Sequence, residues 1–516
     1  MALSSIFGTE HEYGIFAPDV KKSGENYYMA SRQVSYDIVR LGADVIGGSN
    51  RQGSLPISME SLLREYGWDA KDFIGGRDVA DALRYIGGSG YMLWNGARFY
   101  VDAGHPEYST PECSTAYELL VAEKAGERIV EAAGKKAEGL MGRRIYLHKD
   151  NSDRHGHSYA AHENYLVTPK LFDLLARAEA SGIFNAWINF LVTRQIWAGA
   201  GKAGSDFGDE AIFQLSQRAE FFSRISSLNT MQYRGIVNTR DNSYADDSSH
   251  KRLHVILGDA NMCDVAIFLK VGVTALFLKM LEDDFFAEHK TFLTEPLRSP
   301  LEVLHDISVD AEMRKKFLLR NEKRIGALEA QEEVLRLIKE YGGQNLSLLN
   351  DTERKVAEHF EEVIIRLRRD PSSLYGWLDH ITKRAIIARQ LNRLGKDAGD
   401  PLAVRLDFLY HDINRSAGLF YKLCDAGQIV QVAQEIDVIR AMTEPPETTR
   451  AWLRSQILKK FHGSYGRWNF LNVKISDGWQ GLVLDNPSAG SRQMCEKLLE
   501  KSRTAEDFFK LWKEEK

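Results

Sequence analysis

The chain is poor in the features that mark secreted and membrane-spanning proteins. It has four cysteines in 516 residues, and none of them forms a CxxC pair. This pattern argues against a zinc ribbon or a disulfide framework, and it fits a reducing cytoplasm. No run of about 18 consecutive apolar residues occurs, and the first residues lack the basic and apolar regions of a signal peptide. We therefore expect a cytoplasmic protein without a membrane span.

Positive charge is not in excess either, since the formal net charge is −5. Nucleic-acid binding favours basic patches on a basic domain, so it is not expected here. Internal repeats and low-complexity tracts are also missing. Apolar residues make up 44% of the chain and charged residues 27%, which is typical of a globular protein with a large core. The length exceeds that of a usual single domain.

The order of predicted elements favours an α+β fold. Strands and helices mix without strict βαβ alternation up to about residue 300, and a mainly helical pattern follows. Predicted strands cover 4–16, 97–103, 143–149, 158–167, 211–217, 231–239, 252–259 and, in short pieces, 467–485. Predicted helices cover 28–45, 115–140, 169–198, 262–285, 311–342, 352–369, 447–461 and 491–513.

One long connection interrupts the first half. Residues 46–92 contain the glycine-rich stretches GGSNRQGS, IGG and IGGSG around a short amphipathic segment. Connections of this length inside a compact domain are usually functional or disordered. One interpretation is a tolerated surface insertion. The other is a mobile lid beside the strand that carries Asp102, with Glu60, Arg64 and Trp68 as its contact residues.

Two predicted strands carry charged side chains on one face. Arg98, Tyr100 and Asp102 alternate along 97–103, and Glu10 and Glu12 alternate along 4–16. Neighbouring carboxylates repel one another unless a cation lies between them. Hard divalent cations take carboxylate oxygens, and Mg²⁺ commonly bridges such groups to phosphates. The alternative is a solvated edge strand. Glu107 and Glu112 follow in what we predict to be a proline-punctuated loop.

Two other patterns invite functional interpretations that we weigh as weaker. Gly199-Ala-Gly-Lys-Ala-Gly204 fits GxGxxG but follows a helix, so a dinucleotide site is not expected. Lys202 within it is not followed by Ser or Thr, so it is not a P-loop lysine, although a flexible loop over phosphates stays open. Four histidines lie between 148 and 162, but His155 and His157 fall in a predicted exposed turn, which disfavours a zinc site.

Six motifs in order give a resemblance to a known family. They are GTEHEYGI, NGARFYVDAGHPEYSTPEC, SYAAHENYL, FQLSQR, RGIVNTRD and RLHVILGDANM. The chain resembles the family of Pup ligases and Pup deamidase/depupylases, which is related to carboxylate-amine ligases of the glutamine synthetase type. The resemblance implies a large catalytic domain over 1–430, with a curved, mainly antiparallel sheet backed by helices and with 46–92 inserted. It also implies a small C-terminal domain over 431–516.

The resemblance also implies roles for particular residues. Asp102 matches the catalytic acid of the family, acting as nucleophile or base. Arg98, Thr110, Arg252 and Trp468 match positions expected to face ATP or its phosphates. Metal-site positions match Glu10, Tyr100, Glu107, His162 and His254, and Glu12 faces the same way. The implied cofactors are Mg²⁺ and ATP, or ADP with phosphate.

Within the family, three cues resemble the deamidase branch more than the ligase branch. They are the 46–92 insertion, the short Asp102-Ala-Gly-His-Pro-Glu107 spacing and Pro111. The implied function is deamidation of the C-terminal Gln of the modifier Pup and cleavage of Pup–lysine isopeptide bonds. The implied partners are Pup and pupylated proteins, with no nucleic acid and no membrane. Two alternatives are a Pup–protein ligase and a catalytically silent paralogue that binds Pup or a nucleotide.

Overall fold

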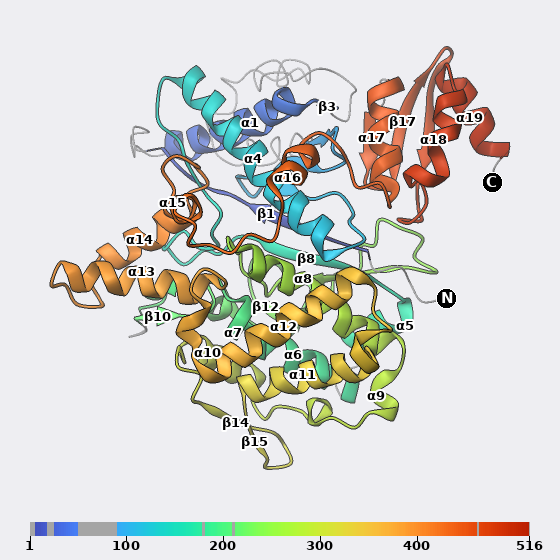
Figure 1. The fold of residues 1–516 in the computed structure, drawn as a ribbon. Helices are drawn as coiled ribbons and strands as arrows, with labels where there is room; N and C mark the ends of the chain where they lie inside the picture. The colour runs from blue at the N-terminus through green and yellow to red at the C-terminus, as the bar shows by residue number, and fades with distance from the viewer. Residues whose placement is uncertain are drawn as a thin grey trace. The chain divides into compact units, whose positions relative to one another are not determined.

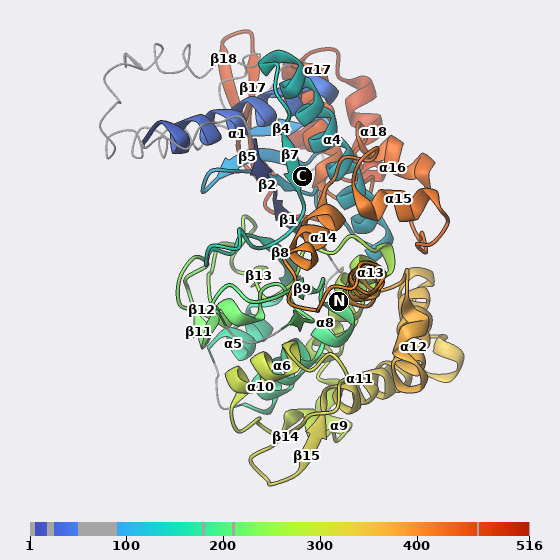
Figure 2. The ribbon, with the colours of Figure 1, turned by 90° about the vertical axis from the view of Figure 1, so that its left-hand side faces the viewer.

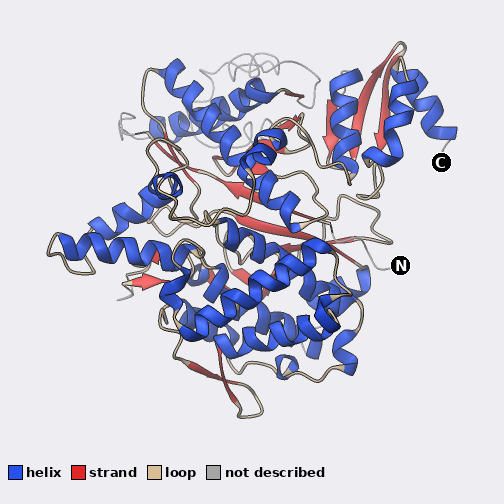
Figure 3. Cartoon of the chain, viewed as in Figure 1, coloured by secondary structure: helices blue, strands red, loops and turns tan. Residues whose placement is uncertain are grey.

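The computed structural model describes residues 6–17, 25–49, 90–177, 181–208, 212–461 and 464–514. The chain forms two compact units, each built from segments that are distant in the sequence. The first unit comprises Met1–Thr9, Thr115–Leu120 and His148–Gln434, and the second comprises Glu10–Ser114, Val121–Leu147 and Glu435–Lys516. Both units contain helices and strands, and Figure 3 colours the two kinds of element along the chain. Within the described ranges, no helix is long and apolar enough to cross a membrane.

An antiparallel sheet forms the centre of the second unit. Its strands follow the order β1-β6-β5-β4-β3. The bounds are β1 (Phe7–Glu12, of which the last three residues belong to this unit), β3 (Gly48–Ser49), β4 (Tyr91–Leu93), β5 (Arg98–Asp102) and β6 (His105–Ser109). A further short pairing joins β2 (Gly14–Phe16) and β7 (Tyr146–His148).

Two long helices of this unit are tightly packed because glycines face aromatic rings. Helix α1 (Glu25–Ile46) lies against β4 and β5 (Figure 2), and a Cβ atom at Gly42 would lie 2.5 Å from the ring of Phe99. On helix α4 (Ala116–Met141), a Cβ at Gly126 would lie 2.4 Å from the ring of Tyr108. Any larger residue at either position would have to push the helix away from its aromatic neighbour.

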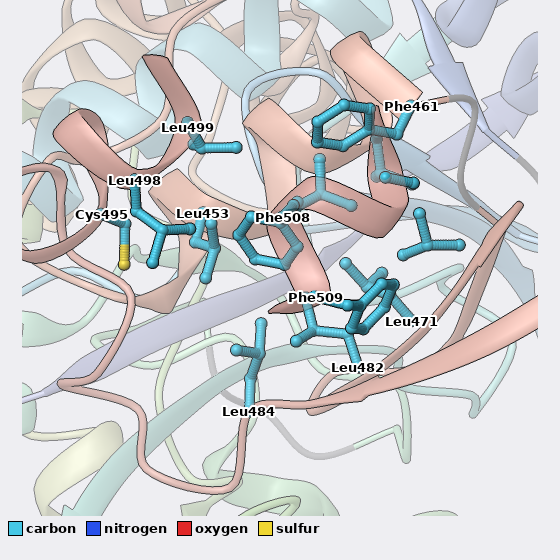
Figure 4. Close-up of a cluster of buried hydrophobic side chains, with 14 of the residues drawn as sticks. Leu453, Phe461, Leu471, Leu482, Leu484, Cys495, Leu498, Leu499, Phe508 and Phe509 are labelled. Carbon is cyan, nitrogen blue, oxygen red and sulfur yellow. The ribbon is translucent and has the colours of Figure 1, made fainter. Parts of the chain in front are cut away.

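The C-terminal segment adds a compact layer with its own apolar cluster. Strands β16 (Ser464–Arg467), β17 (Phe470–Ile475) and β18 (Gly478–Val483) form an antiparallel sheet in that order. The helices are α16 (Glu435–Ala441), α17 (Arg450–Phe461), α18 (Arg492–Lys501) and α19 (Ala505–Glu514). Leu453, Leu471, Leu482, Leu498 and Phe508 meet in the cluster (Figure 4). The predicted domain boundary near residue 430 stays a prediction.

The first unit is largely helical. Its helices are α5 (Pro169–Ala176), α6 (Gly182–Thr193), α7 (Gln195–Ala198), α8 (Asp264–Glu282), α9 (Phe285–Glu288), α10 (Pro300–Ser308), α11 (Ala327–Tyr341), α12 (Asp351–Arg369), α13 (Asp379–Arg393), α14 (Leu402–His411) and α15 (Leu419–Asp425). Short 3₁₀ turns are η2 (Ala219–Phe221), η3 (Phe292–Thr294), η4 (Gln344–Leu346) and η5 (Pro371–Leu374). Helices α11 and α12 lie side by side (Figure 1).

The strands of this unit form short pairs. They are β8 (Ala161–Val167), β9 (Lys202–Ala203), β10 (Phe213–Gln214), β11 (Phe222–Ser227), β12 (Arg234–Asn238), β13 (Lys251–Val255), β14 (Lys316–Leu318) and β15 (Arg324–Gly326). Pairs β8–β13, β9–β10 and β14–β15 are antiparallel, and β11–β12 is parallel. With the sheet of the second unit, this bears out the α+β class and its mainly antiparallel character.

The most apolar helix, α8, is buried almost throughout, and its charged residues are paired inside the protein. Asp264 at its start accepts hydrogen bonds from the backbone N–H groups of Val432 and Ala433. The ammonium of Lys270 donates to the carbonyl of Asp259 and to Oδ1 of Asn261. A buried charge is tolerated when it is hydrogen-bonded in this way. The helix is therefore part of the buried core.

Three helical predictions were wrong in part. The predicted helix 491–513 is divided into α18 and α19. The first half of 311–342 forms the β14–β15 hairpin, and only Ala327–Tyr341 is helical. The stretch 169–198 is divided into α5, α6 and α7, with Ser181 capping α6 by accepting from the N–H of Phe184. Most of the 46–92 insertion, including Glu60, Arg64 and Trp68, lies outside the described residues.

Candidate functional site

The sheet of the second unit aligns acidic side chains across three adjacent strands. Glu12 on β1 lies opposite Glu107 on β6, and Glu107 in turn lies opposite Tyr100 on β5. Because directly opposite residues of antiparallel strands point to the same face, these side chains form a row. The next row along contains Glu10, Ser109 and Arg98. Sequence alternation predicted each strand's face but not this register.

Asp102 completes the cluster at the end of the hairpin between β5 and β6. Ala103 and Gly104 form its two-residue turn, both with positive φ (46° and 98°), which is the backbone of a tight hairpin turn. Asp102 therefore lies opposite His105. Oxygen atoms of Glu12, Asp102 and Glu107 lie within 4.8 Å of one another. Glu12 and Glu107 are buried, whereas Asp102 is exposed.

Glu107 was expected in a loop, and that expectation was wrong, since it lies inside β6 and is only 2% exposed. Burial raises the pKa of its carboxyl, and the negative charges of Asp102, Glu10 and Glu12 raise it further. The hydroxyl of Tyr100 donates a hydrogen bond to Glu107, which acts in the opposite direction. Burial also raises the pKa of Tyr100 well above its usual value, so the phenol stays protonated.

Three further side chains border this cluster. Nδ1 of His105 lies 3.3 Å from a carboxylate oxygen of Glu12. The guanidinium of Arg98 lies 4.2 Å from the centre of the Tyr100 ring. Thr110, the residue after β6, is buried. His105 was not singled out from the sequence, because an isolated histidine next to a proline gives no periodic signal.

Glu112 has a different role from the cluster. It accepts hydrogen bonds from the guanidinium groups of Arg450 and Arg454 on α17, both of them buried. Arg454 also lies over the ring of Trp468, 5.1 Å from its centre, and donates to the carbonyl of Trp468. Trp468 is half-buried. Glu112 thus links the strand region to the segment that holds the predicted adenine-facing tryptophan.

The first unit holds the other predicted site residues. His162 and Asn164 alternate on β8, with His254 directly opposite Asn164 on β13 and Arg252 two residues before it. The rings of His162 and His254 lie edge to face, with centres 4.8 Å apart. On the other face of β8, Glu163 forms a buried ion pair with Arg194. Strand β8 therefore anchors one face in the core and presents His162 and Asn164 on the other.

The weaker sequence motifs have structural roles. Lys202 is fully buried and ion-paired with Asp206 and Glu220, so the flexible-loop alternative for the glycine-rich stretch is wrong. His155 and His157 are exposed in a turn, as predicted, and His157 pairs with Asp153.

The donor set of the second unit is suited to a hard cation. Carboxylate oxygens are what Mg²⁺ prefers, and Glu107 is buried among other carboxylates, where a cation would favour its ionised form.

Comparison with known proteins gives a consistent result. The Pup-ligase protein family model matches residues 5–474. A depupylase from Acidothermus cellulolyticus is 35% identical over 512 residues, which is 97% of each chain. A Pup deamidase/depupylase from Mycobacterium tuberculosis is 32% identical over 93% of each chain. A Pup–protein ligase from Acidimicrobium ferrooxidans is 36% identical over 80% of this chain and 89% of the ligase.

Solved structures of the same family are also similar. The ligase PafA in its complex with the prokaryotic ubiquitin-like protein Pup matches with a TM-score of 0.75 and 27% identity, over 96% of this chain and 92% of that one. PafA in complex with ADP matches with a TM-score of 0.70 and 30% identity, over 83% and 94%. The family model and these relatives cover most of the chain, and the chain therefore belongs to the Pup-ligase protein family, as its motifs predicted.

Proposed function

We propose that this protein is an ATP- and Mg²⁺-dependent amidohydrolase that deamidates the C-terminal Gln of Pup and cleaves Pup–lysine isopeptide bonds. The observation that carries the proposal is the division within the carboxylate cluster. Glu12 on β1 and Glu107 on β6 are buried, and Asp102 is exposed beside the turn that joins β5 to β6. Buried carboxylates suit a bound cation, whereas an exposed one can reach a carbonyl carbon brought by a large substrate.

Asp102 is the proposed catalytic residue. A carboxylate in this position either attacks the γ-carboxamide carbon or takes a proton from the attacking water. Both the C-terminal Gln and the isopeptide bond present the same γ-carboxamide, so one acid serves both reactions.

Glu10, Tyr100 and Glu107 would hold Mg²⁺, with Glu12 as the next candidate. When bound, the cation would neutralise this acidic face and stabilise negative charge that develops nearby. Tyr100, which stays protonated, orients Glu107 through its hydrogen bond. The predicted metal-site roles of His162 and His254 remain part of the proposal.

For the nucleotide, we assign Arg98, Thr110 and Trp468, with Arg252 facing phosphate. Arg supplies a planar donor pair that suits phosphate oxygens. The relative PafA was solved with ADP, which supports a nucleotide here, either ATP or ADP with phosphate. Pup and pupylated proteins are the proposed partners, because PafA was solved with Pup and the relatives are named for acting on it. The cytoplasmic location stays a prediction.

The extent of the sequence matches to the named relatives supports hydrolysis over ligation. The match to the depupylase spans 97% of this chain, while the match to the ligase spans 80%. The 46–92 insertion and the short spacing from Asp102 to Glu107 resemble the deamidase branch as well. The ligase alternative is supported by its 36% identity and by the PafA structures. A silent paralogue is disfavoured by the intact set Glu10, Asp102 and Glu107.

The direction of the reaction tests the proposal. Purified protein is incubated with ATP, Mg²⁺, a lysine-bearing acceptor and Pup ending in either Gln or Glu. We expect ammonia release from the Gln form and release of the acceptor from a preformed conjugate, with little net ATP consumption. Efficient conjugation of the Glu form, with ADP accumulating in step with conjugate, would instead establish a ligase. No turnover of any of these substrates would favour the silent paralogue.

A further inference from the structure

Asn164 connects the two residues of β13 that carry predicted site roles. Its side-chain oxygen, Oδ1, lies 3.0 Å from Nη1 of Arg252 and 2.8 Å from Nδ1 of His254. The register explains this position. Asn164 on β8 is directly opposite His254 and diagonal to Arg252, which lies opposite Leu166. Residues directly and diagonally opposite on one face of a strand pair are within reach of one another.

The arginine fixes the orientation of the asparagine amide. A guanidinium is always protonated and has only donors. If the amide were turned over, its NH₂ group would face the N–H of Arg252, and two donors would lie at hydrogen-bond distance. The atom facing Arg252 must therefore be the carbonyl oxygen. Arg252 is itself held, because its Nε donates to the carbonyl of Asn242 at 2.7 Å and its guanidinium lies over the ring of Tyr244.

The oriented amide then fixes the histidine. An amide oxygen can only accept, so Nδ1 of His254 must be the donor in the 2.8 Å contact. In the neutral imidazole only one ring nitrogen carries a proton, and the other has its lone pair available. For His254 the lone pair is on Nε2. Because His254 is only 2% exposed, the ring cannot exchange this partner for bulk water.

We propose that Asn164 is a positioning residue that sets the Nδ1–H tautomer of His254 and aligns the guanidinium of Arg252. Arg252, Asn164 and His254 thus form a hydrogen-bonded chain, which we call the relay. In this relay the permanently charged guanidinium of Arg252 orients the amide of Asn164, and the amide in turn places the lone pair of neutral His254 on Nε2. A histidine held in this tautomer is prepared to act as an acceptor or a metal ligand through Nε2. An effect of Asn164 on turnover rests on the proposed function. The tautomer assigned to His254 is independent of it.

The tautomer is measured directly by long-range ¹⁵N–¹H correlation spectra of the full chain labelled at histidine, at alkaline pH where imidazole is neutral. The His254 signals are identified by their loss in His254→Gln. We expect Nδ1 protonated in the wild type. In Asn164→Leu, which has similar volume and no acceptor, the Nδ1–H signal should be lost or shared with the Nε2–H form. Asn164→Asp keeps an acceptor and should restore Nδ1–H.

Asn185→Leu is the matched control, because Asn185 is a half-buried asparagine of the same unit that donates to the carbonyl of Thr294. It should leave the His254 spectrum unchanged. An Nε2–H tautomer in the wild type, or an unchanged Nδ1–H signal in Asn164→Leu, would overturn the proposal. If the protein also hydrolyses the amide, Asn164→Leu should lower kcat by about 10–100-fold and Asn164→Asp should recover most of it. Normal turnover with a changed tautomer would separate the relay from catalysis.

Discussion

Tyr100 donates its phenolic hydrogen to the carboxylate of Glu107, the residue directly opposite it on the neighbouring strand. The bond favours the ionised form of Glu107 against burial and against three nearby carboxylates, all of which raise its pKa. Glu107 therefore depends on cationic or donor partners to keep its charge. Glu10 is one of these three carboxylates, and a cation bound between Glu10 and Glu107 would relieve the repulsion between them.

Glu10→Gln should weaken binding of ATP·Mg²⁺ by about tenfold or more, which corresponds to about 1.4 kcal/mol, and should lower activity together with it. A neutral amide cannot hold the cation as a carboxylate does. Isothermal titration calorimetry with and without Mg²⁺ measures the effect, and binding of the nucleotide without metal serves as the control. Unchanged affinity in the presence of metal would remove Glu10 from the site.

Asp102→Asn should abolish amide hydrolysis while leaving the fold and nucleotide binding nearly intact. Loss of a positioned acid–base group costs on the order of 10²–10⁴ in rate, and loss of a nucleophile should cost more. Because Asp102 is exposed, its replacement should hardly change the thermal midpoint. The protein must be freshly prepared, since a site that hydrolyses amides could convert the new Asn back to Asp. Retention of more than about a tenth of the activity would contradict either role.

Glu112→Gln should destabilise the protein by about 3 kcal/mol at neutral pH. Burial raises the pKa of Glu112, but the guanidinium groups of Arg454 and Arg450 outweigh it and hold the pKa at about 2, below the usual 4.5. The lower pKa in the folded state means that ionised Glu112 stabilises fully above 4.5, and that this stabilisation is lost as the pH falls toward 2.

Urea denaturation at a series of pH values checks this dependence. The difference in the free energy of unfolding between wild type and Glu112→Gln should be nearly constant from pH 7 to about pH 5. It should become smaller below about pH 4.5. Glu447→Gln is the control, since Glu447 and Arg492 form an exposed pair and exposed pairs contribute about 0–1 kcal/mol. Equal, small effects of the two substitutions would show that the ion pairs of Glu112 with Arg450 and Arg454 contribute little to the stability of the protein.

Lys202→Met should lower stability by about 3–5 kcal/mol without changing nucleotide affinity, because it leaves the buried acids Asp206 and Glu220 without their cation. Denaturation midpoints and nucleotide titration measure the two effects separately. Lys316→Met, which removes an exposed pair with Glu329, should change neither appreciably. A large loss of nucleotide affinity in a folded Lys202→Met protein would return the glycine-rich stretch to the phosphate site.

Side-chain alternation predicted the acidic faces of β1 and β5 because period-two spacing is a local property of the chain. The place of Glu107 was not predictable in the same way. Pro106 and Pro111 indicate a loop, yet Pro106 lies within β6, where its carbonyl accepts from the N–H of Tyr13. A proline has no backbone N–H and takes part in a strand only through its carbonyl. The sequence alone does not show which carbonyls accept hydrogen bonds from a neighbouring segment.

Non-local pairing explains the other differences. The β14–β15 hairpin has a helix-like composition, and its reversal depends on Glu322 at positive φ (67°), where no glycine marks the turn. The contact from Asn164 to His254 joins residues 90 positions apart and exists only once the register of β8 and β13 is set. The six ordered motifs predicted the family without knowledge of the β14–β15 turn or of the contact from Asn164 to His254. A family resemblance is recognised from matching residues and does not require the strand pairing to be known.

The two-residue turn at Ala103 and Gly104 constrains how this hairpin can change in length. In a regular ladder, one residue inserted within β6 between His105 and Glu107 would carry the carboxylate of Glu107 to the opposite face of the sheet, away from Tyr100. A chain could keep an insertion between Asp102 and Glu107 only together with a longer turn or a bulge that absorbs it. The spacing between Asp102 and Glu107 and the set of side chains on this face of the sheet therefore cannot change independently of each other.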